Sequence, residues 1–276
     1  MSEPILPDYG GLTFEDFKVE DDSNTFWWAS VVGPMLGYKD LKSFQKVLDR
    51  TTKAFIALGI SHYENIKLVE REFGDATCVD YKLTRFACYL AAMSGDPKKE
   101  EVAFAQAYFA EKTRLYELHI QAGEDMDRML IRDELMEGNK SLSAVAHKSG
   151  VEDYAKFMNA GYLGMYNMMS FELATKRNIK KEHLFDSMGR TELAANLFRV
   201  TQTEERIKSR NINGQFNLER THENVGREVR DFVVGNTGKA PENLRQSRKL
   251  AEFKKGLKKE QREMKKVDKP KRKKLE

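Results

Sequence analysis

Residues 25–59 read TFWWASVVGPMLGYKDLKSFQKVLDRTTKAFIALG. The β-branched and aromatic start of this stretch, Thr25–Ala29, predicts a strand. A short helix follows, and then a strong amphipathic helix from about Asp40 to Leu58, which Gly59 ends. A strand followed directly by helices predicts a mixed fold with a small sheet near the N-terminus.

Helical patterns dominate the rest of the chain. We expect helices at Tyr81–Met93, capped by Asp80, and from Asp96-Pro97 to Glu137, ended by Gly138. Shorter helices are expected at Leu142–Lys148, Asp153–Ala160, Phe171–Arg177, Thr191–Ser209 and Thr221–Phe232. The predicted class is therefore α+β and predominantly α-helical, with a small antiparallel sheet in the N-terminal region followed by a helical region.

Several classes of protein do not fit the sequence. No apolar run approaches the ~20 residues needed to cross a bilayer. The N-terminus lacks the basic start and apolar segment of a secretory signal. The two cysteines, Cys78 and Cys88, are too few for a disulfide framework. We therefore expect a cytoplasmic protein with reduced cysteines and no membrane partner.

Charge is distributed unevenly along the chain. Residues 241–276 hold 15 Lys/Arg and 6 Asp/Glu, a net of +9, whereas residues 1–240 hold 32 and 37, a net of −5. This asymmetry predicts a polyanionic partner that is reached through the C-terminal region. The alternative is a disordered, solubilising end.

The predicted helix over residues 40–58 carries a row of cations. At 100° per residue they fall within about 80° of arc on one helix face, while apolar residues occupy another face. A cation at each helical turn suits a phosphate backbone, because each contact releases a condensed counterion. The alternative is an ordinary solvated face, since Asp49 lies at its edge. The row consists of Lys39, Lys42, Lys46, Arg50 and Lys53.

A second cationic set lies in the C-terminal region. Leu250, Leu257 and Met264 recur every seven residues and form an imperfect apolar seam, which Glu260 interrupts. We expect this region to be disordered alone and to gain helix on a polyanion. The rival prediction is that it packs on the acidic body. Its candidate phosphate contacts are Lys254, Lys255, Lys258, Lys259 and Arg262.

Two further patterns favour structure over recognition. Adjacent side chains on a strand point to opposite faces, so we expect Trp27 in the core, although stacking on a base is the alternative for the Trp27-Trp28 pair. Residues 142–157 resemble a helix-turn-helix, but Glu152-Asp153 would repel phosphates. A plain helical hairpin is the better interpretation.

Signals for catalysis are weak. The five histidines are not paired at metal-ligand spacing, and neither Cys-x-x-Cys nor a phosphate-binding Gly-x-x-x-x-Gly-Lys occurs. Cys88 fits a small buried residue, and Gly161 and Gly164 fit turns. We expect no catalytic residue, cofactor or metal ligand, although scattered carboxylates could still assemble a magnesium site.

The chain resembles a known family over residues 25–240. Its first part resembles the BRO N-terminal domain, and the whole is similar to the DNA damage-inducible protein D family. The blocks that carry the resemblance are Phe26–Ala29, Leu36–Tyr38, Lys42–Phe44, Tyr81–Leu90, Gly95–Pro97, Ala105–Arg114, Gly161–Tyr166, Met188–Arg199, Thr201–Glu205 and 221–230. Ser30, where the family often has arginine, and Pro34 depart from the pattern.

The resemblance implies a bacterial SOS-response protein, active in DNA repair or recombination. It predicts four regions: an N-terminal segment (1–24), a BRO-N-like domain (25–120), a helical domain (121–234) and a basic linker or tail (235–276), disordered or conditionally helical. Its expected partners are DNA, a recombinase filament, or both, which implies a nucleoid-associated protein. A phage-like BRO transcriptional regulator or antirepressor, and a metal-dependent nuclease or defence effector, are the alternatives.

Overall fold

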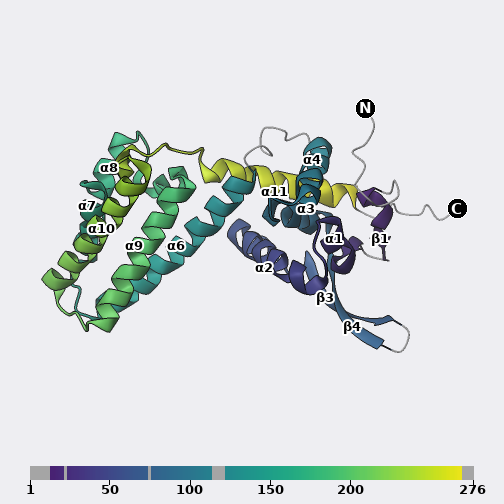
Figure 1. The fold of residues 1–276 in the computed structure, drawn as a ribbon, viewed down its shortest axis with the longest axis horizontal. Helices are drawn as coiled ribbons and strands as arrows, with labels where there is room; N and C mark the ends of the chain where they lie inside the picture. Colours follow the sequence, from purple (N-terminus) through teal and green to yellow (C-terminus); the bar gives the residue numbers. More distant parts are fainter. Residues whose placement is uncertain (1–12, 22–23, 74–75, 114–121, 269–276) are drawn as a thin grey trace. The chain divides into compact units, whose positions relative to one another are not determined.

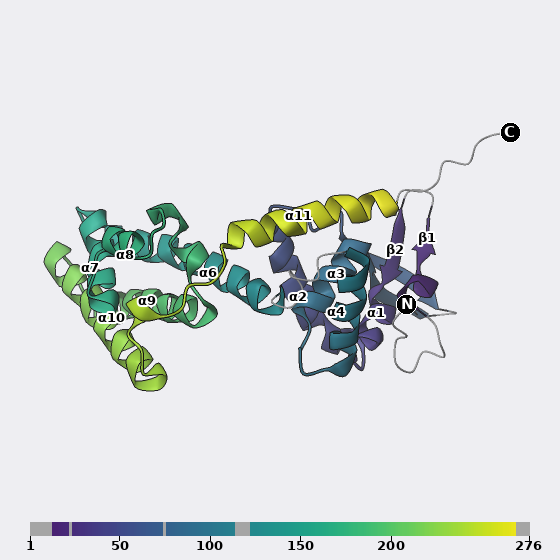
Figure 2. The ribbon, with the colours of Figure 1, turned by 90° about the horizontal axis from the view of Figure 1, so that it is seen from above.

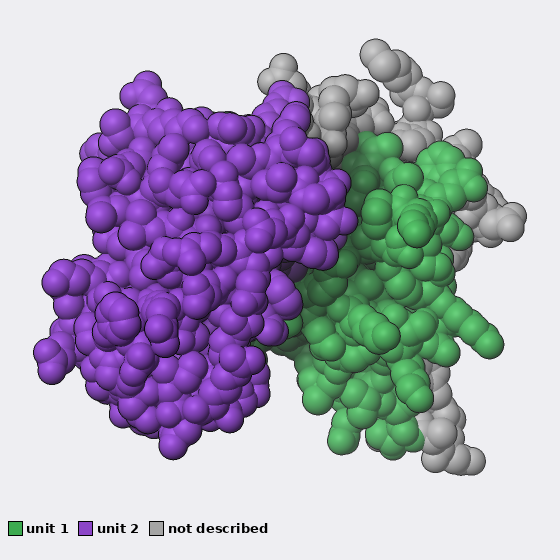
Figure 3. All heavy atoms as spheres, turned by 60° about the vertical axis from the view of Figure 1, so that its left-hand side comes forward, with its two compact units in different colours: residues 1–127, 252–276 green, residues 128–251 purple. Residues whose placement is uncertain are grey.

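The structure is a computed structural model that describes residues 13–21, 24–73, 76–113 and 122–268. The chain divides into two compact units, coloured separately in Figure 3. Unit 1 comprises residues 1–127 together with 252–276, and unit 2 comprises residues 128–251. The C-terminal segment therefore returns to the unit in which the chain begins.

Unit 1 contains the small antiparallel sheet that the sequence predicts. Its strands lie in the order β1 (Val19–Glu20), β2 (Thr25–Trp28), β4 (Ala76–Leu83) and β3 (Ile66–Phe73). Trp27 of β2 pairs with Leu83 of β4, and β3 and β4 form a hairpin that pairs along its whole length. The hairpin was not predicted, because Leu68 and Val79 are exposed and no apolar alternation marks it.

Five α-helices belong to the described part of unit 1 in whole or for most of their length. They are α1 (Ala29–Met35), α2 (Leu41–Leu58), α3 (Arg85–Ser94), α4 (Glu100–Thr113) and α11 (Leu250–Val267), preceded by a 3₁₀ turn at Phe14–Phe17. α2 matches its prediction closely. Asp40 caps it by accepting a hydrogen bond from the Ser43 amide, and Gly59 ends it with a left-handed φ of 64°.

The predicted start of the next helix is wrong. Thr84 caps α3, since its side chain accepts a hydrogen bond from the Ala87 amide. Asp80 lies in β4 instead and is buried. There it accepts hydrogen bonds from the amide and hydroxyl of Ser30 and forms an ion pair with Arg71 at 2.8 Å. An aspartate that looked like a cap therefore ties α1 to the hairpin.

The core of unit 1 surrounds α3, which is buried from Phe86 to Ser94. Phe86 meets Phe55 of α2 edge to face, with ring centroids 5.7 Å apart. Trp27 is fully buried, stacks on Phe14 at 4.5 Å and donates its indole N–H to the Phe14 carbonyl. The prediction that Trp27 belongs to the core is confirmed, and so is the burial of Cys88.

The prediction of a disordered or conditionally helical tail over residues 235–276 does not hold for α11. Leu250, Leu257 and Met264 of the apolar seam are buried in the folded protein, and so is Phe253 beside them. Glu260, which interrupts the seam, is buried with them, and this burial raises the pKa of its carboxyl group. The apolar side chains are covered without a polyanion, because α3 and its neighbours leave a surface that α11 fills.

Unit 2 is helical. It contains most of α6 (Ala122–Lys148), then α7 (Tyr154–Tyr166), α8 (Ser170–Lys176), α9 (Arg190–Ser209) and α10 (Gln215–Thr237), with 3₁₀ turns at Lys181–His183, Phe185–Ser187 and Pro241–Asn243. Figure 2 shows these helices from above. The predicted end at Gly138 is wrong, because this glycine lies inside α6. The helix predicted to end at Phe232 continues to Thr237.

The closest helix pair of unit 2 is α7 against α10. Gly161 and Gly164 are helical rather than turn residues, and Gly164 touches the backbone of α10 at Glu223. Gly226 of α10 approaches the Gly161 carbonyl in the same way. Gly164 and Gly226 thus lack the side chains that would hold the two backbones apart, and Gly161 leaves room for the side chains of Arg199 and His222.

Candidate nucleic-acid interface

The cationic face of α2 is exposed, whereas its opposite side is buried. Lys42, Lys46 and Lys53 are exposed, and Lys39 is exposed just before the helix. Arg50 differs from the lysines: it is half-buried and forms an ion pair with Asp127. The structure therefore leaves the four lysines presented to solvent and turns Arg50 towards a carboxylate.

Packing holds this face in place. The apolar residues of α2 are buried against the rest of unit 1, namely Phe44, Val47, Leu48, Phe55 and Leu58. Asp49, at the edge of the lysines, accepts a hydrogen bond from Gln45 at 3.0 Å. The helix cannot rotate about its axis without exposing its apolar side, so the lysines have a fixed direction.

The second cationic face lies on α11. Lys255, Lys258, Lys259 and Arg262 are exposed, and Lys254 is half-buried. With 3.6 residues per turn, Lys255, Lys259 and Arg262 fall on the side opposite the buried seam. Lys266 continues this line four residues further on and pairs with Glu263 at 2.8 Å. The predicted residues are thus presented by a packed helix.

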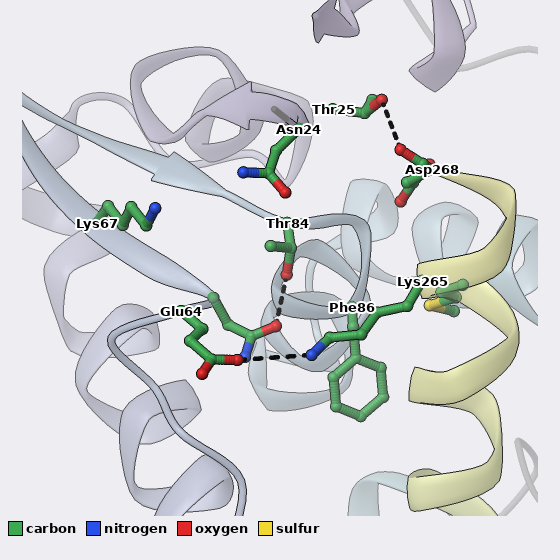
Figure 4. A pocket seen from close by; sticks show the side chains of 10 residues that line it. Asn24, Thr25, Glu64, Lys67, Thr84, Phe86, Lys265 and Asp268 are labelled. Carbon is green, nitrogen blue, oxygen red and sulfur yellow. Dashed lines mark hydrogen bonds and ion pairs between the residues drawn. The ribbon is translucent and has the colours of Figure 1, made fainter. Parts of the chain in front are cut away.

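Two ion pairs join the end of α11 to the rest of unit 1. Arg85 bonds both Asp268, at 2.8 Å, and Glu15, while its guanidinium lies 4.7 Å from the centre of the Trp27 ring. Lys265 meets Glu64 at 3.5 Å, which is visible in Figure 4.

Burial and charge compete at these carboxyl groups. Burial raises the pKa of Asp268 and outweighs the effect of Arg85. Burial also acts upward on the pKa of Glu15, but there the hydrogen bonds and charge of Arg85 prevail and lower the pKa. One arginine thus links the start of the unit to its last helix.

A pocket of about 460 Å³ opens beside these contacts (Figure 4). Phe86 and Met264 supply apolar lining, and Lys67, Lys265, Glu64 and Asp268 supply charges of both signs. Thr25 donates a hydrogen bond to the Asp268 carbonyl at 3.3 Å. The two lysines and two carboxylates balance, and Lys265 and Asp268 are already paired within the unit. The pocket therefore has no predominant charge that would select a ligand.

Sequence reasoning missed an aromatic and cationic cluster around Phe26 and Trp28, whose side chains lie on the face of the sheet opposite Trp27. The guanidinium of Arg71 lies 3.8 Å from the centre of the Trp28 ring, and the Lys82 ammonium lies 4.1 Å from that of Phe26. The opposite faces of Trp27 and Trp28 were predictable from strand geometry. Their cationic neighbours were not, because they come from the unpredicted hairpin.

A buried polar cluster in unit 2 was also missed. Arg177 and Glu192 form an ion pair at 2.8 Å with almost no exposure. Tyr166 donates to the same carboxylate and accepts a hydrogen bond from Asn196. Burial raises the pKa of Glu192 despite the opposing effect of Arg177. The sequence offered one signal, since these residues, except Arg177, lie in blocks that carry the family resemblance.

Arg199 extends this cluster to α10. Its guanidinium donates hydrogen bonds to His222 at 2.6 Å and to Asn196 at 3.1 Å. An arginine cannot accept, so Nε2 of His222 must accept, and Nδ1 donates to the Phe157 carbonyl at 3.0 Å. The imidazole is therefore neutral, and its burial together with the charge of Arg199 keeps its pKa well below the usual value.

The helix-turn-helix alternative finds no exposed recognition helix. α7 follows the turn at residues 149–153, and Asp153 caps it through the Lys156 amide. Phe157, Ala160 and Tyr162 of α7 are buried. A plain helical hairpin describes this segment.

Two further features concern metal binding and membrane insertion in the described ranges. Among those residues, no group of three or more His, Cys, Asp or Glu is placed to hold a metal ion. No helix in the described part of the chain is long and apolar enough to span a membrane.

The fold and its faces define a mostly helical α+β protein with two cationic helix surfaces, and sequence comparison places it in a family. The DinD C-terminal domain model matches residues 122–253. DNA damage-inducible protein D of Escherichia coli (strain K12) is 38% identical over 247 residues, which cover 84% of this chain and 90% of the relative. The chain belongs to the DNA damage-inducible protein D family.

Proposed function

We propose that this protein takes part in the response to DNA damage as a non-enzymatic nucleic-acid-binding protein. The E. coli relative is named for its induction by DNA damage, and the similarity extends over most of both chains. Binding takes place through phosphate contacts, which Lys42, Lys46 and Lys53 of α2 make together with the cations of α11. Such a protein acts in the cytoplasm, in association with the nucleoid.

The exposed lysine row of α2 carries the proposal. Three exposed cations on one side of the helix, with a buried opposite side, match the electrostatic pattern expected of a phosphate-binding helix. The α11 cations support it, because the helix is folded and its binding does not require new helix formation. A recombinase filament is a further candidate partner, supported by the family resemblance alone.

Changing Lys42, Lys46 and Lys53 together to Glu tests this function. We expect affinity for a short duplex to fall at least about a hundredfold at 0.1 M salt, because three counterion-releasing contacts become repulsive. The slope of log affinity against log salt should fall by roughly 2–3. The matched control changes Lys180, Lys181 and Lys239, exposed lysines of unit 2, to Glu.

Circular dichroism must show that both variants stay folded. Equal affinity in the α2 variant and the wild type would refute a phosphate-binding role for this face. Incubation of the wild type with plasmid and single-stranded DNA, with and without magnesium, separates the functional classes. Cleavage of the DNA would contradict a non-enzymatic function and indicate a nuclease. Sequence-selective binding without cleavage would favour a transcriptional regulator.

A further inference from the structure

Unit 1 carries two cationic faces on two helices that pack on the same buried helix. α2 contacts α3 through Phe55 and Phe86. α11 lies against α3 as well: Asp268, next to its last residue, bonds Arg85, and Met264 lines the same pocket as Phe86. In Figures 1 and 2 α3 lies between α11 and α2. Each cationic face is therefore the side of its helix that points away from α3.

Each face is long enough to act alone. From Lys42 to Lys53, and from Lys255 to Lys266, the helix rises about 16 Å, which is roughly five base pairs along a duplex. Lys255, Lys258 and Arg262 form no ion pair within the described residues. The α2 lysines are likewise exposed, so both faces offer cations that are available to phosphates.

Carboxylates border both faces. Asp49 lies beside the α2 lysines, and Asp127 holds Arg50. On α11, Glu252 and Glu263 lie along one flank of the cations. Glu64 pairs with Lys265 where the loop after α2 meets α11. A phosphate backbone that runs off either face across these borders would meet negative charge.

We propose that unit 1 holds two nucleic-acid segments at once, one on the α2 face and one on the α11 face, and so bridges them. This inference rests on the proposed function and adds to it the number of segments that one molecule binds. Bridging two segments is a property that a damage-response protein can use where two DNA ends or strands must be held together.

A co-capture experiment tests the inference. Two duplexes of about 12 base pairs, roughly 40 Å long, carry donor and acceptor dyes and are mixed with full-length protein. Bridging gives energy transfer that depends on protein, whereas anisotropy reports the binding of a single duplex. The α2-face variant changes Lys42, Lys46 and Lys53 to Gln, and the α11-face variant changes Lys255, Lys259 and Arg262 to Gln. The control changes Lys180, Lys181 and Lys239 to Gln.

We expect each face variant still to bind a single duplex through its remaining face, at most about a hundredfold more weakly than the wild type, and to lose energy transfer. The control should retain both. An equimolar mixture of the two face variants should not restore transfer, because no molecule carries both faces.

Three results would overturn the inference. One is wild-type binding without energy transfer. Another is full transfer by either face variant. The third is restored transfer in the mixture, which would mean that two copies each supply one face. If the wild type binds no duplex at all, the proposed function itself fails, and anisotropy distinguishes this case from the others.

Discussion

At the scale of single residues, the polar groups of unit 2 that sequence reasoning overlooked are buried. His222 is fully buried between Arg199 of α9 and the Phe157 carbonyl of α7, and both contacts require the neutral imidazole. Protonation would place a second cation against Arg199 in a buried site. The residue therefore couples the packing of three helices to pH.

We expect this coupling to lower stability in mild acid. The pKa of His222 in the folded protein lies well below the ordinary value of 6.5. Between these two values the unfolded chain binds a proton that the folded chain does not, so stability is complete above pH 6.5 and falls as the pH drops. The loss approaches about 1.4 kcal/mol per pH unit.

Urea unfolding at pH 7.5, 6.5 and 5.5 measures this loss. In His222→Gln the amide oxygen can still accept from Arg199 but cannot titrate, so the variant should be less stable at pH 7.5 and lose less between pH 6.5 and 5.5. The same pH-dependent loss in both proteins would assign it to other groups.

At the scale of elements, the contact of α7 with α10 depends on missing side chains. A Cβ atom at Gly164 would press into the Glu223 carbonyl of α10. We expect Gly164→Ala to destabilise the protein by about 2 kcal/mol or more, since backbone cannot move aside as a flexible side chain does. Gly235→Ala in α10 is the matched control, because nothing lies within 4 Å of its added methyl group.

The control should be neutral or stabilising by roughly 0.5–1 kcal/mol, the usual gain of alanine over glycine in a helix. Thermal melts of both variants compare the two positions. Equal melting temperatures would show that the helices can separate at little cost.

The elements also show what the sequence could predict. α2 was predictable with its cap and its end, because one side is apolar throughout and Asp40 and Gly59 mark its limits. The β3–β4 hairpin was not, because its exposed Leu68 and Val79 break the alternation that reveals strands. The glycines of α7 resembled turn residues, since their reason for being there is a partner helix about 60 residues away.

The candidate site likewise has parts that the sequence predicts and parts that it does not. The exposure of the α2 lysines follows from helical spacing, which the sequence contains. The partner of Arg50 does not, because Asp127 lies 77 residues away. The folded state of α11 was also out of reach, since a basic helix with one apolar side is stable only where another surface covers that side.

At the scale of the whole molecule, the C-terminal helix completes the unit in which the chain begins. Phe253, Leu257 and Met264 are buried, and Asp268 is bound to Arg85. Because of these contacts, α11 is part of the core of unit 1 and also carries positive charge on its exposed side. A unit assembled from residues 1–127 alone would expose the surface that α11 covers.

We therefore expect deletion of residues 250–276 to destabilise unit 1 by more than about 4 kcal/mol, since three buried apolar side chains contribute about 1.5–3 kcal/mol each. Deletion of residues 269–276 is the control. It removes the basic run Lys269-Pro270-Lys271-Arg272-Lys273-Lys274 and keeps the seam, so it should leave the melting temperature nearly unchanged. The stability of Leu257→Ala should lie between those of the two deletions, with a destabilisation of about 2–5 kcal/mol.

If the long deletion melted like the wild type, α11 would contribute charge but no packing, and its removal would lower DNA affinity alone. Thermal melts and salt-dependent binding of the three proteins, measured together, separate the packing of α11 from its charge.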